Sequence, residues 1–298
     1  MSAINIAPKA KQNLKRVPDS LLAQIVANFL RHPTGRIGVA LVVTASLVAI
    51  IGPLVMPIDP FTMYRGQEVQ APSMHHPLGT DEYGRDLLSR TIHGLALSLK
   101  VAGLAVVLGG TPGVLSGLVT GYSVGWFSSA LMRLWDGLLA FPTMLLAITL
   151  ATILGAGPLN AAVALGIISM PQFSRIVRAS VLVERQKDYV LAAHCCGARA
   201  VRIIWRHILP NVVGPVLVQI TLAMGYAILL EAGLSFLGLG IQPPNPSLGG
   251  MLNLSRNYLY QAWWYTFFPG AAIVVLLLGL NWVSEALSDI LDPRAANR

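Results

Sequence analysis

The stretch DYVLAAHCCGARAVRIIWRHILPN, residues Asp188–Asn211, is the longest polar interruption in the second half of a very apolar chain. Gly197 stands where a first short helix would end, because glycine adopts the left-handed conformation of that position without strain. Pro210 is expected to end a second short helix, since it lacks an N–H and clashes with the preceding turn. Basic residues are concentrated in or just before this stretch: Arg185, Lys187, Arg199, Arg202, Arg206 and, when charged, His207. We therefore predict a helix, a tight turn and another helix, held between two membrane spans.

The composition of the chain points to a membrane. Charged residues make up only 11% of the 298 residues, and 54% are hydrophobic. Soluble domains carry about a quarter charged residues, so a water-facing fold of this size would leave too much apolar surface exposed. The formal charge of +8 comes from basic residues in loops and at the N-terminus, where they set orientation. They do not form one continuous basic face, which argues against nucleic acid as a partner.

Uncharged runs of about 20 residues, long enough to cross a bilayer core, divide the chain into segments. We expect an all-α integral membrane protein with six transmembrane helices and cytoplasmic N- and C-termini. The expected segments are a cytoplasmic basic tail with an interfacial helix (1–36), a first transmembrane helix (37–57), a periplasmic segment (58–93), a five-helix core (94–290) containing a cytoplasmic loop (178–211), and a cytoplasmic tail (291–298). Within the core, spans are expected near residues 100–133, 138–154, 159–177, 212–230 and 266–284.

One span carries a glycine at every fourth position: Gly109, Gly113, Gly117 and Gly121. These glycines share one helical face, and small residues let another helix approach closely in lipid. The pattern serves either packing within one bundle or a seam between two copies of the chain, and we favour the first.

The periplasmic segment contains a dense charged patch, HPLGTDEYGRDLLSR (His76–Arg90). A short amphipathic surface helix is expected over residues 86–94. Asp81, Arg85, Asp86 and Arg90 lie on the side where a periplasmic partner would dock, so they are docking candidates. Alternatively, they only cap and tie the surface helix. Adjacent histidines cannot easily converge on one ion, so no metal site is expected here.

Glu231 lies near the outer end of an otherwise uncharged span. An ionisable group at that depth is costly and is a functional candidate by default. It either lines a translocation path or holds a gate, or it is an interfacial carboxylate that is paired or snorkels at the outer boundary.

The central stretch resembles the EAA loop of ABC-importer permeases, whose pattern is Glu-Ala-Ala, three residues, Gly, nine residues, Ile-x-Leu-Pro. The matching positions are Leu191, Ala192, Ala193, Gly197, His207, Leu209 and Pro210, with Leu191 in place of the Glu and His207 in place of the Ile. The resemblance implies that the loop is a coupling helix that docks on a cytoplasmic ATPase. The alternative is a basic loop that merely obeys the positive-inside rule.

Further blocks resemble the dipeptide/oligopeptide/nickel permease family, C-type subunit. They are HPLGTDEYGRDLLSR, EAGLSFLGLGIQPP (Glu231–Pro244), AWWYTFFPG (Ala262–Gly270) and the closing NWVSEALSDILDPR (Asn281–Arg294). Two departures stand out: Ser284-Glu285 where Gly-Asp is commoner, and Leu248 where the family has Trp. The resemblance covers about residues 20–295 and implies a type I ABC-importer permease fold in the bacterial inner membrane.

This resemblance implies a set of partners. They are a homologous B-type permease, two cytoplasmic ATPase subunits and a periplasmic solute-binding protein. The chain has no GxxxxGK[ST] loop to hold phosphates, so we expect ATP and Mg to be used by the partner subunits. No cofactor and no enzymatic activity are expected of the chain itself.

The implied activity is ATP-driven import of di- or oligopeptides, or of nickel or another solute, by alternating access. The competing interpretations are an ion-driven secondary transporter and an intramembrane enzyme. The first predicts broken helices and intramembrane carboxylates in two related halves, and the second predicts a nucleophile with a base. Neither pattern is present in the sequence.

Overall fold

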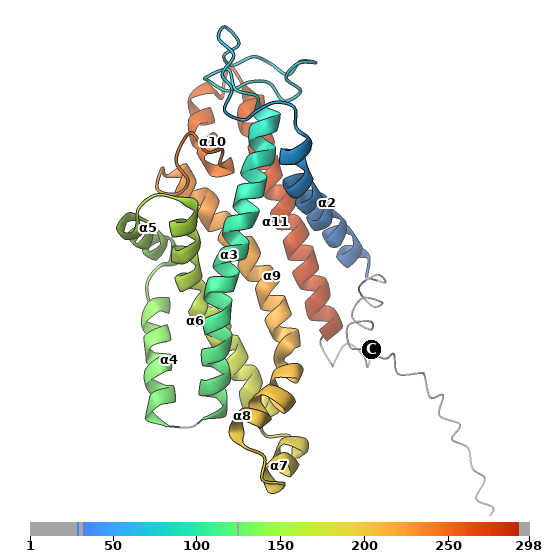
Figure 1. Cartoon of the computed structure of the whole chain (residues 1–298), viewed down its shortest axis with the longest axis vertical. Coiled ribbons are helices and arrows are strands. Elements are labelled where there is room, and N and C mark those ends of the chain that lie inside the picture. Colours follow the sequence, from blue (N-terminus) through green and yellow to red (C-terminus); the bar gives the residue numbers. More distant parts are fainter. Residues whose placement is uncertain (1–28, 30–31, 124, 292–298) are drawn as a thin grey trace, which may run out of the picture.

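The computed structural model describes Phe29 and residues 32–123 and 125–291, and this part of the chain is helical apart from its connections. The expected interfacial helix and both tails fall mostly outside the described residues. Figure 1 shows the arrangement as an elongated bundle. The helices are α2 (Pro33–Val55), α3 (Leu87–Tyr122), α4 (Trp126–Leu139), α5 (Thr143–Leu154), α6 (Pro158–Glu184), α7 (Asp188–Cys195), α8 (Ala200–Ile203), α9 (Leu209–Phe236), α10 (Leu248–Ser255) and α11 (Trp263–Leu291).

Four helices in the described residues are long and apolar enough to cross a membrane, namely α2, α3, α11 and the continuous helix Ala200–Phe236. The pair α4 and α5 makes a fifth span if the two count together, although they meet at a bend of 94°. The sixth expected span corresponds to α6, whose second half carries Gln172, Arg175 and Arg178 and is less apolar. The count of six is therefore not established by helix length and composition.

The span expected over residues 138–154 is not one continuous helix. Helix α4 ends at Leu139, and α5 starts afresh at Thr143 after Pro142, whose backbone is extended. A proline disfavours the helical conformation in the residue before it, here Phe141. The sequence between the two helices therefore breaks the span.

The separate surface helix expected over residues 86–94 is also wrong. Asp86 is the N-cap of α3, where its carboxylate accepts a hydrogen bond from the Ser89 N–H at 2.7 Å. Helix α3 then continues for 36 residues, roughly 54 Å at the usual rise per residue. It is longer than the bilayer core of about 30 Å, so it extends beyond the membrane into the outer segment.

The glycine ladder of α3 packs against α6, as the interpretation of packing within one bundle predicted. A Cβ on Gly113 would lie 2.6 Å from the Cβ of Phe173, and one on Gly117 would lie 2.6 Å from the Ser174 carbonyl oxygen. The ladder also meets α6 at Gly109 and Gly121. Side chains larger than glycine would push the two helices apart.

Pro210 does not end a helix, contrary to expectation. Helix α8 continues through a π-helical turn, Ile204–Ile208, directly into α9. The Leu209 N–H bonds the Ile204 carbonyl, five residues back. A π turn widens the helix locally, so that the proline, at the first positions of α9, continues the helix despite its missing N–H.

The two ends of the bundle hold the candidate segments. Residues 56–86 and α10 lie at one end, and α7 and α8 lie at the opposite end (Figure 1). An alanine-rich core between α2, α3, α5, α6, α9 and α11 separates them, including Ala49, Ala102, Ala105, Ala147 and Ala162. By the positive-inside rule we expect α7 and α8, which carry the basic residues, on the cytoplasmic side.

Candidate functional site

Helix α7 ends in a complete left-handed cap. Gly197 has φ +77°, as predicted. Its N–H bonds the His194 carbonyl at 2.9 Å, and the Ala198 N–H bonds the Ala193 carbonyl at 3.1 Å. These two bonds form a Schellman motif, which satisfies the last carbonyls of the helix and reverses the chain. The sequence therefore fixes the turn between α7 and α8.

The loop presents large apolar side chains to solvent. Leu191, Val201 and Trp205 are 53%, 67% and 53% exposed, and Ala192 beside Leu191 is also exposed. The basic residues of the same loop are exposed with them: Arg199, Arg202 and Arg206. Exposed apolar anchors surrounded by arginine are typical of a protein-binding surface.

The opposite face of the loop is firmly packed on the bundle. Val190, Ile203 and Ile208 are fully buried in a cluster with α3, α6 and α9. Ala193 and Leu209 pack against the same cluster. The residues that match the EAA pattern therefore lie on two faces of the loop. Leu191 and Ala192 are exposed, whereas Leu209 packs against the buried cluster.

A polar network at the base joins three helices. The Tyr189 hydroxyl donates to the Glu184 carboxylate at the end of α6. Asn211 Nδ2, on α9, donates to the Tyr189 oxygen at 3.2 Å and to the His207 carbonyl at 2.7 Å. Lys187 Nζ pairs with Glu184 at 2.7 Å. Burial and the bond to Glu184 raise the pKa of Tyr189 to about 12. Sequence reasoning missed this network, since no motif marks its members.

Arg185 and His194 tie the loop to α3. One Arg185 nitrogen donates to the carbonyls of Gly121 and Tyr122 at 3.2 and 3.3 Å. A cation there complements the negative end of the α3 dipole. The Tyr122 hydroxyl lies 2.9 Å from His194 Nε2, with the rings stacked. Arg185 therefore caps the C-terminal end of α3, in addition to contributing positive charge to the loop.

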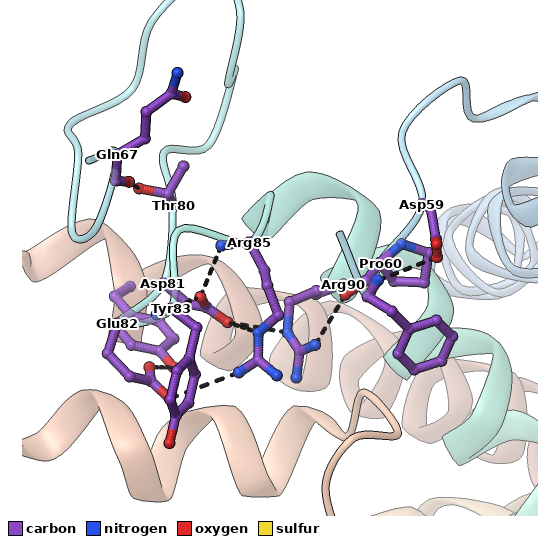
Figure 2. A network of polar contacts seen from close by, with 11 residues as sticks. Asp59, Pro60, Gln67, Thr80, Asp81, Glu82, Tyr83, Arg85 and Arg90 are labelled. Atoms are coloured by element: carbon purple, nitrogen blue, oxygen red, sulfur yellow. Dashed lines mark hydrogen bonds and ion pairs between the residues drawn. The ribbon is translucent and has the colours of Figure 1, made fainter. Parts of the chain in front are cut away.

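At the outer end, Asp81 is the centre of a buried ion cluster. Figure 2 shows its carboxylate facing the guanidinium groups of Arg85 and Arg90. Arg85 Nε lies 2.6 Å from it and Arg90 Nε lies 3.3 Å from it. Its other oxygen accepts the N–H groups of Tyr83 and Arg85, both at 2.9 Å. Glu82 adds an ion pair to Arg85 and a hydrogen bond from Tyr265 of α11.

The docking interpretation of this patch does not fit its burial. Asp81 and Asp86 are 0% exposed, and Arg85 and Arg90 are 3% exposed. Asp86 also pairs with His76 at 2.9 Å, and Arg90 donates to the Pro60 carbonyl at 3.0 Å. The four side chains bind one another and the backbone, so they tie the outer segment to α3 rather than facing a partner. Within the described residues there is no group of three metal-ligating side chains.

Glu231 is buried inside the chain rather than at a boundary. Its carboxylate accepts hydrogen bonds from Ser98 of α3 at 2.7 Å, from Ser235 of α9 at 2.8 Å and from Ser247 at 3.3 Å. Ser247 is the N-cap of α10. The carboxylate therefore does not snorkel to a surface, because three hydroxyls satisfy it internally. Glu231 joins α10 to the α3–α9 pair.

Two known families match this chain. Residues 113–297 match the family described as binding-protein-dependent transport system inner membrane component. Residues 20–72 match the N-terminal TM domain of oligopeptide transport permease C. The first match covers more than half of the chain, which therefore belongs to the family of inner membrane components of binding-protein-dependent transport systems. It is a multi-pass inner-membrane transport subunit, and the family implies ATPase and binding-protein partners.

Curated relatives match over most of their length. The Di/tripeptide transport system permease protein DppC of Pseudomonas aeruginosa is 39% identical, covering 100% of this chain and 99% of the relative. The Dipeptide transport system permease protein DppC of Escherichia coli K12 is 40% identical, covering 93% and 95%. Among solved structures, a chain of the MetNI methionine ABC transporter has a TM-score of 0.49 at 18% identity, covering 69% of this chain and 94% of that chain.

Proposed function

We propose that this chain is the C-type permease subunit of an ATP-driven importer that carries di- or oligopeptides across the inner membrane. The observation that carries the proposal is the full-length similarity to relatives named as di- and tripeptide permeases. The chain would adopt the six-span type I fold, with both termini in the cytoplasm and α4 with α5 as one broken span.

The proposed assembly contains a homologous B-type permease, two cytoplasmic ATPase subunits and a periplasmic solute-binding protein. ATP and Mg would act in the ATPase subunits, and this chain would hold no cofactor of its own. The exposed surface of Leu191, Ala192, Val201 and Trp205 supports docking of an ATPase on α7 and α8. Its buried base would transmit movement to α6 and α9.

Alternating access then follows from unequal affinities. ATP and the loaded binding protein each shift the permease pair toward the state that they bind better, and no other property of a ligand shifts such an equilibrium. Solute choice would rest largely with the binding protein, and nickel or another solute is the alternative cargo.

The test is uptake in cells that lack this chain and are complemented with variants. Wild type should restore uptake of a labelled dipeptide but not of nickel. Ala192→Asp should abolish uptake and ATPase co-purification, because it places an unpaired charge in a close contact. Ala71→Asp is the matched control, since Ala71 is an exposed alanine of the outer segment.

Restored nickel uptake without dipeptide uptake would reassign the cargo. Normal uptake and normal co-purification with Ala192→Asp would contradict the role given to the loop.

A further inference from the structure

A groove on the surface of α6, α9 and α11 carries polar side chains at membrane depth. It has a volume of about 390 Å³, and its polar lining consists of Gln172, Gln219, Tyr226 and Asn281. Gln172 and Asn281 lie 12 and 10 residues before the ends of α6 and α11, and Gln219 lies 19 residues into the continuous helix Ala200–Phe236. All three amides fall within the expected membrane spans, residues 159–177, 212–230 and 266–284.

Gln219 is the most deeply buried polar residue of this groove. It is only 5% exposed and lines the cavity. Within the described residues, the amides of Gln219, Gln172 and Asn281 are not bonded to another side chain or to a carbonyl, and the Gln219 amide is not among the fully enclosed atoms that lack a partner. Hydroxyl residues in the same helices behave differently, because Thr221 returns its hydrogen bond to the Val218 carbonyl of its own helix.

Lipid is a poor occupant for this groove. Hydrocarbon offers no partner to an amide, and each unsatisfied polar group in it is costly. The exposed face of α2 is different, because Val43, Leu47, Ile50 and Leu54 are all apolar. The amide-lined face therefore covers water, a polar ligand or polar side chains of the second permease.

We infer that this groove, whose polar side chains are Gln172, Gln219, Tyr226 and Asn281, is the part of the solute path that binds the main chain of the transported peptide. The inference rests on the proposed function. Each Gln or Asn offers one carbonyl acceptor and two N–H donors, which match the N–H and C=O groups of a peptide bond. The groove volume is in the range of small-ligand sites.

The absence of charge among the four polar residues fits a path rather than a tight site. Uncharged amides bind a peptide main chain whatever its side chains are. They also bind weakly, since a neutral hydrogen bond gains little over water, and a conducted solute must leave as easily as it enters.

The first arm of the test asks whether the groove is wet. In the full assembly in proteoliposomes, with Cys195 and Cys196 replaced by serine, we compare Leu222→Cys in the groove with Val43→Cys on α2. The two positions are matched at 45% and 48% exposure. A water-soluble thiol reagent should label Leu222→Cys at least tenfold faster, and excess dipeptide with binding protein should slow that labelling.

Equal labelling rates at Leu222→Cys and Val43→Cys would overturn the inference. They would indicate that lipid or a helix of the second permease covers the groove. Fast labelling without protection by peptide would keep the groove wet but reject the peptide as its occupant. This arm reports on the groove even if the wild-type assembly carries no peptide, in which case the proposed function fails separately.

The second arm asks whether the amides contact the main chain. Gln219→Leu and Asn281→Leu should each lower peptide uptake about fivefold, the usual effect of one lost hydrogen bond, while assembly and basal ATP hydrolysis stay normal. Gln219→Asn should restore part of the uptake. The loss should be equal for dialanine and for a lysine–glutamate dipeptide, and a loss confined to one of them would contradict main-chain recognition.

Discussion

The two ends of this molecule use their charges in opposite ways. At the outer end, Asp81, Arg85 and Arg90 are buried and bind one another. At the opposite end, in α7 and α8 and the turns around them, Arg199, Arg202 and Arg206 are exposed beside exposed apolar side chains. A charge that is already paired and covered stabilises a segment, whereas an exposed charge next to an apolar anchor is available to a partner. Charged segments thus serve stability at one end and, as we propose, recognition at the other.

The largest effect is expected from Asp81→Ala. This change leaves two buried guanidinium groups without their shared carboxylate, and breaking a buried pair costs about 3–5 kcal/mol. Folded protein in the membrane should fall sharply, as measured by the thermal stability of the purified permease. Asp59→Ala is the control, because Asp59 is an exposed carboxylate of the same segment and should change stability little. A stable Asp81→Ala protein with weakened binding-protein response would restore the docking interpretation.

A matched pair of glycines separates backbone strain from partner recognition. Gly197 and Gly66 have φ values of +77° and +79°, and nothing lies within 4 Å of a Cβ added at either one. Arginine at each position should cost about 1 kcal/mol. Only Gly197→Arg should lower co-purification of the ATPase, because Gly66 lies in the outer segment. Equal effects in both variants would mean that strain alone is responsible.

A smaller effect is expected from Tyr189→Phe. It removes the hydroxyl that bonds Glu184 and Asn211, at a cost of about 1 kcal/mol per lost hydrogen bond. The exposed face of α7 stays intact, so ATPase should still bind. A loosened base should instead reduce the solute carried per ATP hydrolysed, which is measured in proteoliposomes. Tyr260→Phe, at a fully exposed outer tyrosine, serves as the control, and an unchanged ratio in Tyr189→Phe would show that the network does not transmit movement.

The smallest effect concerns pH. Burial and the Glu184 bond raise the pKa of Tyr189 to about 12, above its ordinary value of about 10. A raised pKa contributes stability that is fully present below pH 10 and is lost as the pH rises through 12. The anchoring of the loop should therefore be constant between pH 6 and 9. The difference between the ultraviolet titrations of wild type and Tyr189→Phe should show one tyrosine ionising near pH 12, and ionisation near pH 10 would exclude the bond.

The sequence by itself determined several features of this protein. Low charge and long apolar runs required a membrane, since no water-facing fold of this size covers so much apolar surface. Gly197 specified the turn after α7, because its conformation is a local property of the backbone. The glycine spacing of α3 specified a close helix contact, and Phe173 and Ser174 of α6 occupy it.

Only the tertiary structure decided the role of the polar groups. The Glu82 carboxylate meets Tyr265, 183 residues away along the chain, and Glu231 meets Ser98 across 133 residues. The same run of charged residues in a sequence can form a surface patch or a buried cluster. Its burial depends on segments that are distant in the sequence and cover it in the fold. The π turn before Pro210 also depends on the tertiary structure. The proline by itself predicts a break in the helix, but Ile203 and Ile208 are packed in the buried cluster and the helix is continuous.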